Sequence, residues 1–238
     1  MSFFKLAELL IFPTFCKLCT TLLDREEEKV VCNYCLKKLT PSDSSCCLCC
    51  GRFFSSSVEP HICKQCLEHK PPYTLHRSCG FYDGELKDLL LLFKYKGFRS
   101  LGRDLILFAI NVMGEKHFLW QDLDMIIPVP LHPSRQRQRG FNQSKILAHE
   151  LARLKKINIE SRILFKIKNR PPQTTLDAKM RRRNLVGAFQ VKNKSAIKGK
   201  KVLLVDDIFT TGATLAECSK TLLAAGAKSV SALTLAQA

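Results

Sequence analysis

Two adjacent carboxylates, Asp206 and Asp207, directly follow a short apolar run of the sequence. That run, residues 202–205, reads Val-Leu-Leu-Val, which is typical of a strand buried on both faces. A loop rich in hydroxyl groups comes next and opens a helix; its residues are Thr210, Thr211, Gly212, Ala213 and Thr214. Backbone N–H groups and hydroxyls at a helix N-terminus suit a phosphate. The neighbouring carboxylates can accept hydrogen bonds from sugar hydroxyls or support Mg²⁺. We therefore expect a phosphate and sugar site, the alternative being an acidic strand end before an ordinary helix start.

Ten of the twelve cysteines lie within residues 16–66, and eight of them form four Cys-x-x-Cys pairs. In each half of this region the two pairs are separated by 12 residues. Two such pairs can place four thiolates tetrahedrally around one Zn²⁺, and a closed set of four makes the ion structural. Buried free cysteines, the alternative, would not require this spacing. The predicted ligands are Cys16, Cys19, Cys32 and Cys35 for one ion, and Cys47, Cys50, Cys63 and Cys66 for the other.

The third cysteine pair can be assigned in two ways, because Cys46 and Cys49 form an overlapping Cys-x-x-Cys. We favour Cys47 and Cys50, since Gly51 follows directly and a turn of this kind often needs a residue with positive φ.

The net charge of +17 comes from one central segment. Residues 135–201 carry 20 basic and 3 acidic side chains, whereas residues 1–134 carry 16 basic and 15 acidic ones. Clustered arginines point to an anionic partner because guanidinium groups pair with phosphate oxygens; a solvated basic surface is the alternative. The candidates for nucleic-acid contact are Arg135, Arg137, Arg181, Arg182 and Arg183. Eight thiolates on two Zn²⁺ would shift residues 1–70 from +1 to −3, which makes them a poor main DNA-binding surface.

The elements that must position these groups are predicted to alternate between strands and helices. Helices are expected from Leu86 to Phe93, with Asp83 as the cap, from Leu147 to Leu154, and from about 213 to 225, ending at Gly226. Strands are expected over residues 123–129, 202–205 and 229–235. This alternation favours an α/β fold with a mostly parallel sheet flanked by helices.

The composition changes at Lys70, which is followed by two prolines. Neither proline continues a regular element, so we predict a small metal-stapled domain over residues 1–70 and an α/β domain over 71–238. No apolar run approaches the roughly 18–20 residues that a membrane-spanning helix needs, and Glu8 interrupts the apolar N-terminus. We therefore expect a cytoplasmic protein without membrane insertion, in which cysteines bind metal rather than form disulfides.

Several segments resemble known proteins. Residues 202–215 are similar to the phosphoribosyl pyrophosphate (PRPP) signature of type I phosphoribosyltransferases. Residues 126–143 (IIPVPLHPSRQRQRGFNQ), together with Pro172-Gln173, Arg181 to Asn184 and Gly187-Ala-Phe189, resemble the ComF family. Members of that family carry a zinc ribbon ahead of a phosphoribosyltransferase-like domain, and the resemblance extends from Cys16 to about Ala236.

The resemblance implies a role for each motif. Asp206 and Asp207 would contact the ribose hydroxyls, with Mg²⁺ bound alongside PRPP, and residues 210–214 would hold the 5′-phosphate. The turn at Arg139 and Gly140 would bind pyrophosphate, and residues 169–184 would close over the substrate. Catalysis would then be mainly electrostatic, with no dedicated nucleophile.

Two functions fit these expectations. In the first, a protein of natural transformation binds PRPP and Mg²⁺ and handles single-stranded DNA; a competence helicase and a recombination-loading protein would be its partners. In the second, the protein is an active phosphoribosyltransferase that acts on an unknown acceptor, independently of DNA. The sequence leaves open whether PRPP is turned over.

Overall fold

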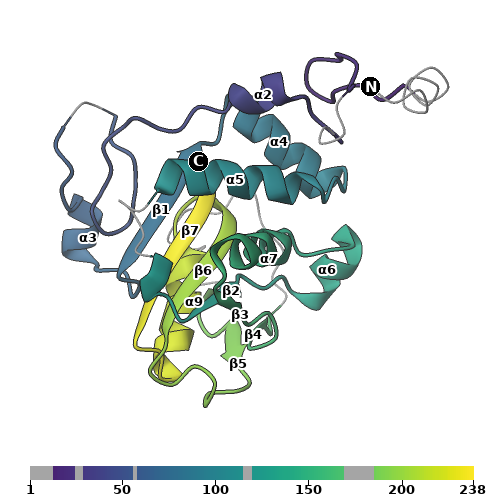
Figure 1. Ribbon diagram of the computed structural model, residues 1–238. Helices are drawn as coiled ribbons and strands as arrows, with labels where there is room; N and C mark the ends of the chain where they lie inside the picture. The colour runs from purple at the N-terminus through teal and green to yellow at the C-terminus, as the bar shows by residue number, and fades with distance from the viewer. Residues whose placement is uncertain (1–12, 25–28, 56–57, 115–119, 169–184) are drawn as a thin grey trace.

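A five-stranded sheet in the order β1-β7-β6-β2-β3 forms the centre of the molecule (Figure 1). The computed structural model describes residues 13–24, 29–55, 58–114, 120–168 and 185–238. The strands are β1 (Leu75–Phe81), β2 (Met125–Pro128), β3 (Asn158–Ile159), β6 (Lys201–Phe209) and β7 (Ser229–Gln237). Neighbouring strands pair in parallel, so their carboxyl ends share one edge. The predicted parallel α/β sheet is confirmed.

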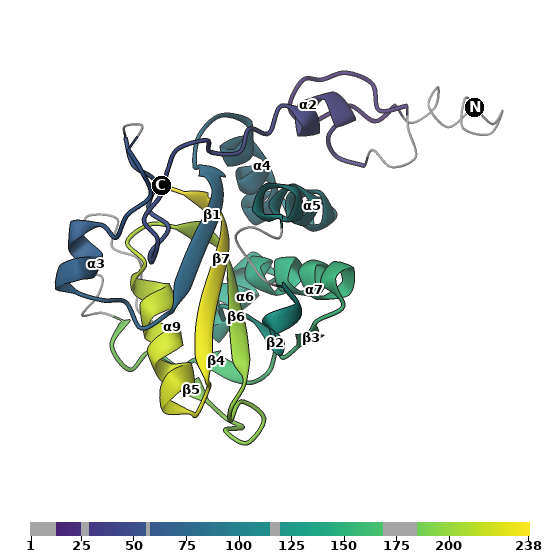
Figure 2. The same ribbon diagram turned by 60° about the vertical axis from the view of Figure 1, so that its left-hand side comes forward.

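Helices cover both faces of this sheet, as Figure 2 shows. The helices α4 (Gly84–Tyr95), α5 (Leu101–Met113) and α7 (Gln143–Lys155) lie on one face, and α9 (Ala213–Ala224) lies on the other. Alternate residues of β6 pack against the helices on the two faces of the sheet. Leu203 and Val205 belong to the core beneath α4, α5 and α7, whereas Val202 and Leu204 pack with α9. Burial on both faces explains the continuous apolar run.

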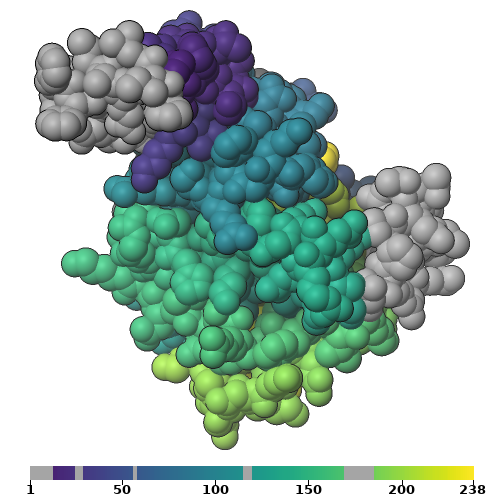
Figure 3. Space-filling view, turned by 90° about the vertical axis from the view of Figure 1, so that its right-hand side faces the viewer, coloured from purple at the N-terminus to yellow at the C-terminus, as the bar shows by residue number. Residues whose placement is uncertain are grey.

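Short elements surround the carboxyl edge of the sheet. The helix α6 (Pro133–Arg139) follows β2, and a two-stranded antiparallel ribbon pairs β4 (Leu164–Lys166) with β5 (Phe189–Val191). A single 3₁₀ turn, η1 (Trp120–Asp122), precedes β2. In Figure 3, residues 135–168 form much of the teal and green face below the purple N-terminal segment.

The cysteine-rich segment contains two short helices, α2 (Asn33–Lys37) and α3 (Lys64–Glu68). We call Cys16, Cys19, Cys32 and Cys35 with the residues between them the first cysteine unit, and Cys47, Cys50, Cys63 and Cys66 with theirs the second cysteine unit. The first unit lies beside α4 and α5, and the second lies beside β1 (Figures 1 and 2). The domain division at residue 70 stays a prediction.

The strand that carries the acidic pair is longer than expected. β6 continues through Asp206 and Asp207 to Phe209, because its parallel pairing with β7 extends to Ile208↔Ala236 and Phe209↔Gln237. The two carboxylates therefore lie within the strand rather than after it. Asp83 does occupy the N-cap position of α4, but its side chain makes no capping hydrogen bond there. Across the described ranges, every helix is too short or too polar to cross a bilayer.

Candidate functional site

The two adjacent carboxylates point to opposite faces of β6, because successive side chains alternate along a strand. Asp207 lies on the side of α4, where its Oδ2 is 3.0 Å from Lys94 Nζ and both side chains are largely buried. Asp206 is held by the N-terminus of α7: the Ser144 hydroxyl donates to its Oδ1 over 2.7 Å. The same oxygen accepts from the backbone N–H of Asp207 at 2.9 Å. Each acid thus has its own partner, and the two roles need not be equivalent.

The environment of Asp206 favours a neutral carboxyl. Burial, and next the charge of Asp207, raise its pKa to about 7, against the opposing effects of the Ser144 hydrogen bond and of Lys94. Near neutral pH the group is therefore divided between its two forms. Sugar hydroxyls or a divalent cation would favour the ionised form, because a carboxylate only accepts hydrogen bonds and binds hard cations.

Asn142 places Ser144 against this carboxylate. As the N-cap of α7, its Oδ1 accepts from the N–H groups of Ser144 and Lys145 at 3.0 and 3.4 Å. Its Nδ2 donates over 3.1 Å to the carbonyl of Val129, the residue directly after β2. One buried amide thus fixes the start of the helix to the neighbouring strand. The sequence did not reveal Ser144 or Lys94 as site residues; Ser144 directly follows the quoted 126–143 segment, whereas nothing in the pattern singles out Lys94.

The loop of residues 210–214, which we call the phosphate loop, turns sharply into α9. Gly212 is its N-cap, with φ of 73°, a left-handed conformation that favours glycine. The Thr211 hydroxyl accepts from Ala213 N–H at 3.4 Å. The first N–H groups of a twelve-residue helix therefore lie beside this loop, as an anion site requires.

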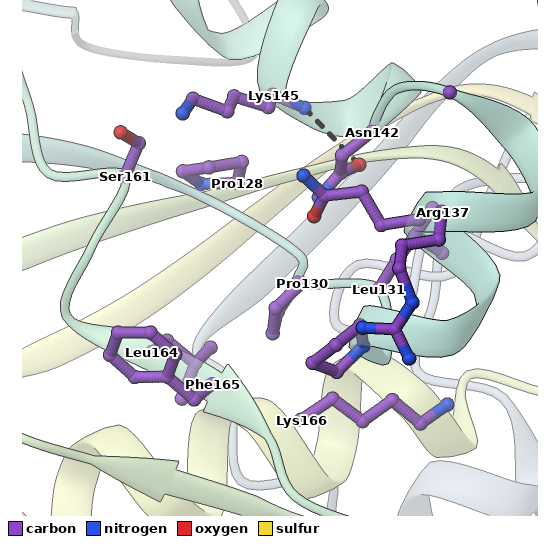
Figure 4. Close-up of a pocket in the computed structure, with 13 residues that line it drawn as sticks. Pro128, Pro130, Leu131, Arg137, Asn142, Lys145, Ser161, Leu164, Phe165 and Lys166 are labelled. Atoms are coloured by element: carbon purple, nitrogen blue, oxygen red, sulfur yellow. Dashed lines mark hydrogen bonds between the residues drawn. The ribbon is translucent and has the colours of Figure 1, made fainter. Parts of the chain in front are cut away.

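A cavity of about 620 Å³ opens between the end of β2, α6, α7 and β4 (Figure 4), and its lining includes Asn142 and Lys145, which flank Ser144 in the sequence. Three cations from three elements line it: Arg137 of α6, Lys145 of α7 and Lys166 of β4. No Asp or Glu is among its described lining residues. Burial, and then the charge of Arg135, lower the pKa of Lys166. An anion would relieve this concentration of positive charge.

The basic residues predicted from the sequence do not all lie in this cavity. Arg137 and Gly140 line it, whereas the Arg139 guanidinium lies over the Tyr95 ring at 5.4 Å. Gly140 has φ of 80° and ends α6. His132 begins the same helix, with Nδ1 accepting from Ser134 N–H at 3.3 Å. Arg181, Arg182 and Arg183 lie outside the described residues.

The eight predicted zinc ligands form two clusters, and within each cluster the ligand atoms lie within 4.8 Å of one another. In the first unit, Sγ–Sγ distances are 3.8 Å for Cys16–Cys35 and 3.5 Å for Cys19–Cys32. In the second, Cys50 and Cys63 are 3.7 Å apart. In both units a backbone N–H donates to the first cysteine's Sγ: Cys32 to Cys16, and Cys63 to Cys47. Four converging thiols fit a structural Zn²⁺, which closes its tetrahedron with sulfur alone.

The four-thiol cluster of the second unit contains Cys47 and Cys50 rather than Cys46 and Cys49. Its other two members are Cys63 and Cys66. Gly51 has the positive φ, 63°, that the assignment assumed. A side chain at Gly51 would also strike the backbone of His76, so the unit approaches β1 closely.

His76 is a buried residue that the sequence did not single out. Burial lowers its pKa to about 4, so its ring is neutral near pH 7. Because the Cys50 carbonyl can only accept, His76 Nδ1–H donates to it over 2.7 Å. Nε2 then accepts from the Thr234 hydroxyl at 2.9 Å. The ring also stacks on Phe209, with centroids 4.2 Å apart and planes inclined by 19°.

Two family models match different parts of this chain. The family model for a double zinc ribbon domain matches residues 8–67, and that for a phosphoribosyl transferase domain matches residues 138–238. Competence protein F of Haemophilus influenzae is 35% identical over 74% of this chain and 78% of its own length. DNA utilization protein YhgH of Escherichia coli K12 is 30% identical over 93% and 96%, and Competence protein ComFC of Bacillus subtilis is 31% identical over 89% and 85%. The similarity thus spans the cysteine units and the sheet together.

Proposed function

The chain belongs to the ComF family of competence proteins, and from this premise we propose that it binds PRPP with Mg²⁺ and handles single-stranded DNA in the cytosol during natural transformation. The observation that carries the proposal is the joining of three features along one sheet edge: the phosphate loop, the acidic pair and the cavity of cations. The carboxyl edge of a parallel sheet is where α/β proteins bind ligands. The hydrogen bond between Ser144 and Asp206 joins the start of α7, which lines the cavity, to β6, which bears the acidic pair.

The described residues suit the separate parts of PRPP. The 5′-phosphate would accept from the N–H groups of the phosphate loop, and the ribose hydroxyls would donate to Asp206 and Asp207. The pyrophosphate would lie against Arg137, Lys145 and Lys166. Mg²⁺ fits the carboxylate oxygens of the acidic pair, and when bound it would neutralise charge on the pyrophosphate.

The same groups could support transfer of the phosphoribosyl group. As the bond between C1 and pyrophosphate breaks, positive charge develops on the ribose and negative charge on the leaving group. Cations fixed around the pyrophosphate would stabilise that leaving group more strongly in a partly buried cavity than in water. The intact acidic pair and loop therefore favour, as the second candidate, an active phosphoribosyltransferase with an unknown acceptor that acts independently of DNA.

The DNA part of the proposal rests on the basic segment and on the relatives' names. Residues 135–201 hold 20 basic side chains, and Arg137 and the neighbouring polar residues of α6 are exposed. The names of the relatives refer to competence and to DNA utilization. A helicase and a recombination-loading protein remain proposed partners.

Calorimetry with PRPP and Mg²⁺ tests the first part. Metal-loaded wild type should bind, and the double variant Asp206→Ala/Asp207→Ala should not. Asp88→Ala, which removes an exposed carboxylate of α4, is the matched control and should bind like wild type. Absence of PRPP binding by the wild type would refute the proposal.

Single-stranded DNA binding, measured by anisotropy at several salt concentrations, tests the second part. Affinity should fall steeply with salt as counterions are released, and Arg135→Ala/Arg137→Ala should reduce both the affinity and the salt slope. An unchanged slope would place the DNA elsewhere. Turnover of PRPP with and without DNA distinguishes the two candidate functions.

A further inference from the structure

The second cysteine unit faces the phosphate loop across a small cavity. A second cavity, of about 260 Å³, separates the two. Its walls come from both sides: Cys50, Arg52 and Gln65 of the second unit face Thr211, Gly212 and Ala213 at the start of α9. The loop that would hold the 5′-phosphate therefore faces, across this cavity, a segment outside the phosphoribosyl transferase match.

Hydrogen bonds to its backbone carbonyls fasten this unit to the start of β1. The N–H of His76 donates to the Cys49 carbonyl at 3.0 Å, and the His76 ring donates to the Cys50 carbonyl. The Arg77 guanidinium donates to the Cys47 carbonyl at 3.3 Å. Three carbonyls of the third Cys-x-x-Cys turn are thus held by two consecutive residues of the sheet, so the turn and the strand must move together.

From His76 the contact continues to the loop itself. The His76 ring stacks on Phe209, the last residue of β6. The Phe209 ring in turn lies under Gly212: a Cβ built there would be 2.8 Å from its Cε2 and 3.4 Å from Tyr73 Oη. Cys50, His76, Phe209 and Gly212 thus form one continuous path of close contacts, and its middle members are buried.

The first cysteine unit has a different neighbourhood. Val31 of this unit, with Leu36 and Leu39 just after it, borders a groove of about 1010 Å³ whose other wall includes Leu107 and Phe108 of α5. The buried apolar residues of the first unit belong to the core that α4, α5 and α7 share. On the other side, Cys47 and Cys50 of the second unit belong, with Tyr73 and Phe209, to the core on the α9 face. This unit provides a control within the same chain.

We propose that the second cysteine unit, with Zn²⁺ bound, positions the phosphate loop through His76 and Phe209, so that Zn²⁺ in this unit and a phosphate on the loop stabilise each other's binding. The inference rests on the proposed function of the loop as a phosphate site. His76 and Phe209 are positioning residues, since they act on the ligand only through the loop.

Such coupling must be reciprocal. If an ordered second unit makes the loop bind phosphate more tightly, a bound phosphate must make the unit hold its Zn²⁺ more tightly by the same factor. Couplings of this kind usually change affinities by about 5- to 150-fold. The first unit packs in another layer of the molecule, so a bound phosphate should leave its affinity for Zn²⁺ unchanged.

The experiment uses the full-length, zinc-loaded protein and ribose 5-phosphate, which carries the loop's expected phosphate without pyrophosphate. The equilibrium distribution of zinc between the protein and a chromogenic chelator is measured with and without the sugar phosphate. We expect the affinity for one of the two zinc ions to rise about fivefold or more, with the other unchanged. In Phe209→Leu this rise should vanish, and calorimetry should show ribose 5-phosphate affinity lowered by the same factor. Phe108→Leu, beside the first unit, is the matched control and should behave like wild type.

The outcomes separate this inference from the function on which it rests. If calorimetry shows ribose 5-phosphate binding but neither zinc ion is held more tightly, the coupling is refuted and the phosphate site stands. If the wild type binds no ribose 5-phosphate, both are refuted. An equal rise in affinity for both zinc ions, or a full rise in Phe209→Leu, would refute the path through this residue. The wild-type measurement decides the matter even if a variant folds poorly.

Discussion

The two cysteine units share a motif and a spacing, but they contact different layers of the molecule. The first shares its apolar core with α4, α5 and α7. The second belongs to the core on the α9 face and borders the phosphate loop. The chemistry of four thiols is the same in both, so the difference lies in what each unit touches.

This difference shows how one repeated structural element can acquire two roles. A closed zinc site contributes folding free energy wherever it occurs. That free energy affects the affinity for a ligand only where the unit is coupled to the loop that binds the ligand. The first unit is therefore expected to act on stability alone, and the second on stability and phosphate binding.

Removal of a zinc ligand should give the largest effect and tests the comparison directly. Cys63→Ser in the second unit should lose one zinc ion and weaken ribose 5-phosphate binding at least about fivefold. Cys32→Ser in the first unit should also lose one zinc ion and lower the melting temperature, but keep the affinity within about twofold of wild type. Metal analysis and calorimetry measure both quantities. Equal losses of affinity in the two variants would break the comparison.

Asp206 tests whether the coupling involves the acidic pair. Its pKa of about 7 lies above the ordinary value of 3.8, so the folded protein binds the proton more strongly than the unfolded chain between these values. The stability that this group contributes therefore falls as pH rises through that interval. Asp206→Asn should raise stability by up to about 4 kcal/mol above pH 7, and the gain should disappear below about pH 4.

Thermal unfolding across pH 4–8 measures this gain, with Asp88→Asn as the exposed control. A stability change in Asp206→Asn that does not depend on pH would contradict the raised pKa. The contacts from Cys50 to Gly212 do not include Asp206, so phosphate protection of one zinc ion should persist in this variant. Loss of that protection would extend the coupling to the acidic pair.

A methyl group at Gly212 should give a smaller effect and probes the contact between loop and unit. Gly212→Ala places a Cβ against the Phe209 ring at a φ of 73°. Gly199→Ala introduces the same change at φ 74° with nothing within 4 Å. Both variants should lose about 1 kcal/mol of stability to backbone strain, and only Gly212→Ala should also lose ribose 5-phosphate affinity. Equal affinities would show that the loop tolerates movement against Phe209.

The local elements of this fold could be predicted where one residue pattern dominates. The apolar run at 202–205 and the helix with Gly226 behind it lie where expected, because buried strands and helix ends leave strong local signals. β3, with two residues, and β4 and β5, with three each, were not predicted, since so short a strand is defined by its partners. The end of β6 was misplaced for the same reason: its pairing with β7 carries it past the acids.

The residues of the candidate site fall into the same two groups: those that belong to a local sequence motif and those that only the fold brings together. The acidic pair, the loop glycine and the cysteine spacing are local motifs, so the sequence alone revealed them. Ser144, Lys94 and Lys166 approach the acidic pair or its cavity from other elements, and only the folded chain brings them there. His76 could not be foreseen, because its role depends on a carbonyl 26 residues earlier and a hydroxyl 158 residues later.

The smallest effect is expected at the two spare cysteines, and it sharpens the definition of the second unit. Cys46 and Cys49 lie outside the four-thiol cluster, and burial raises the pKa of both thiols. Cys49 contributes its backbone carbonyl to His76, which a change of side chain leaves in place. Cys46→Ser/Cys49→Ser should therefore keep two zinc ions per chain and wild-type ribose 5-phosphate affinity, whereas Cys47→Ser/Cys50→Ser should lose one zinc ion together with the affinity. If the first variant instead lost zinc, the overlapping pair would be the ligands. His76 would then contact a ligand residue through its backbone N–H to Cys49 rather than through its ring to Cys50, and the path from zinc to the loop would begin at Cys49.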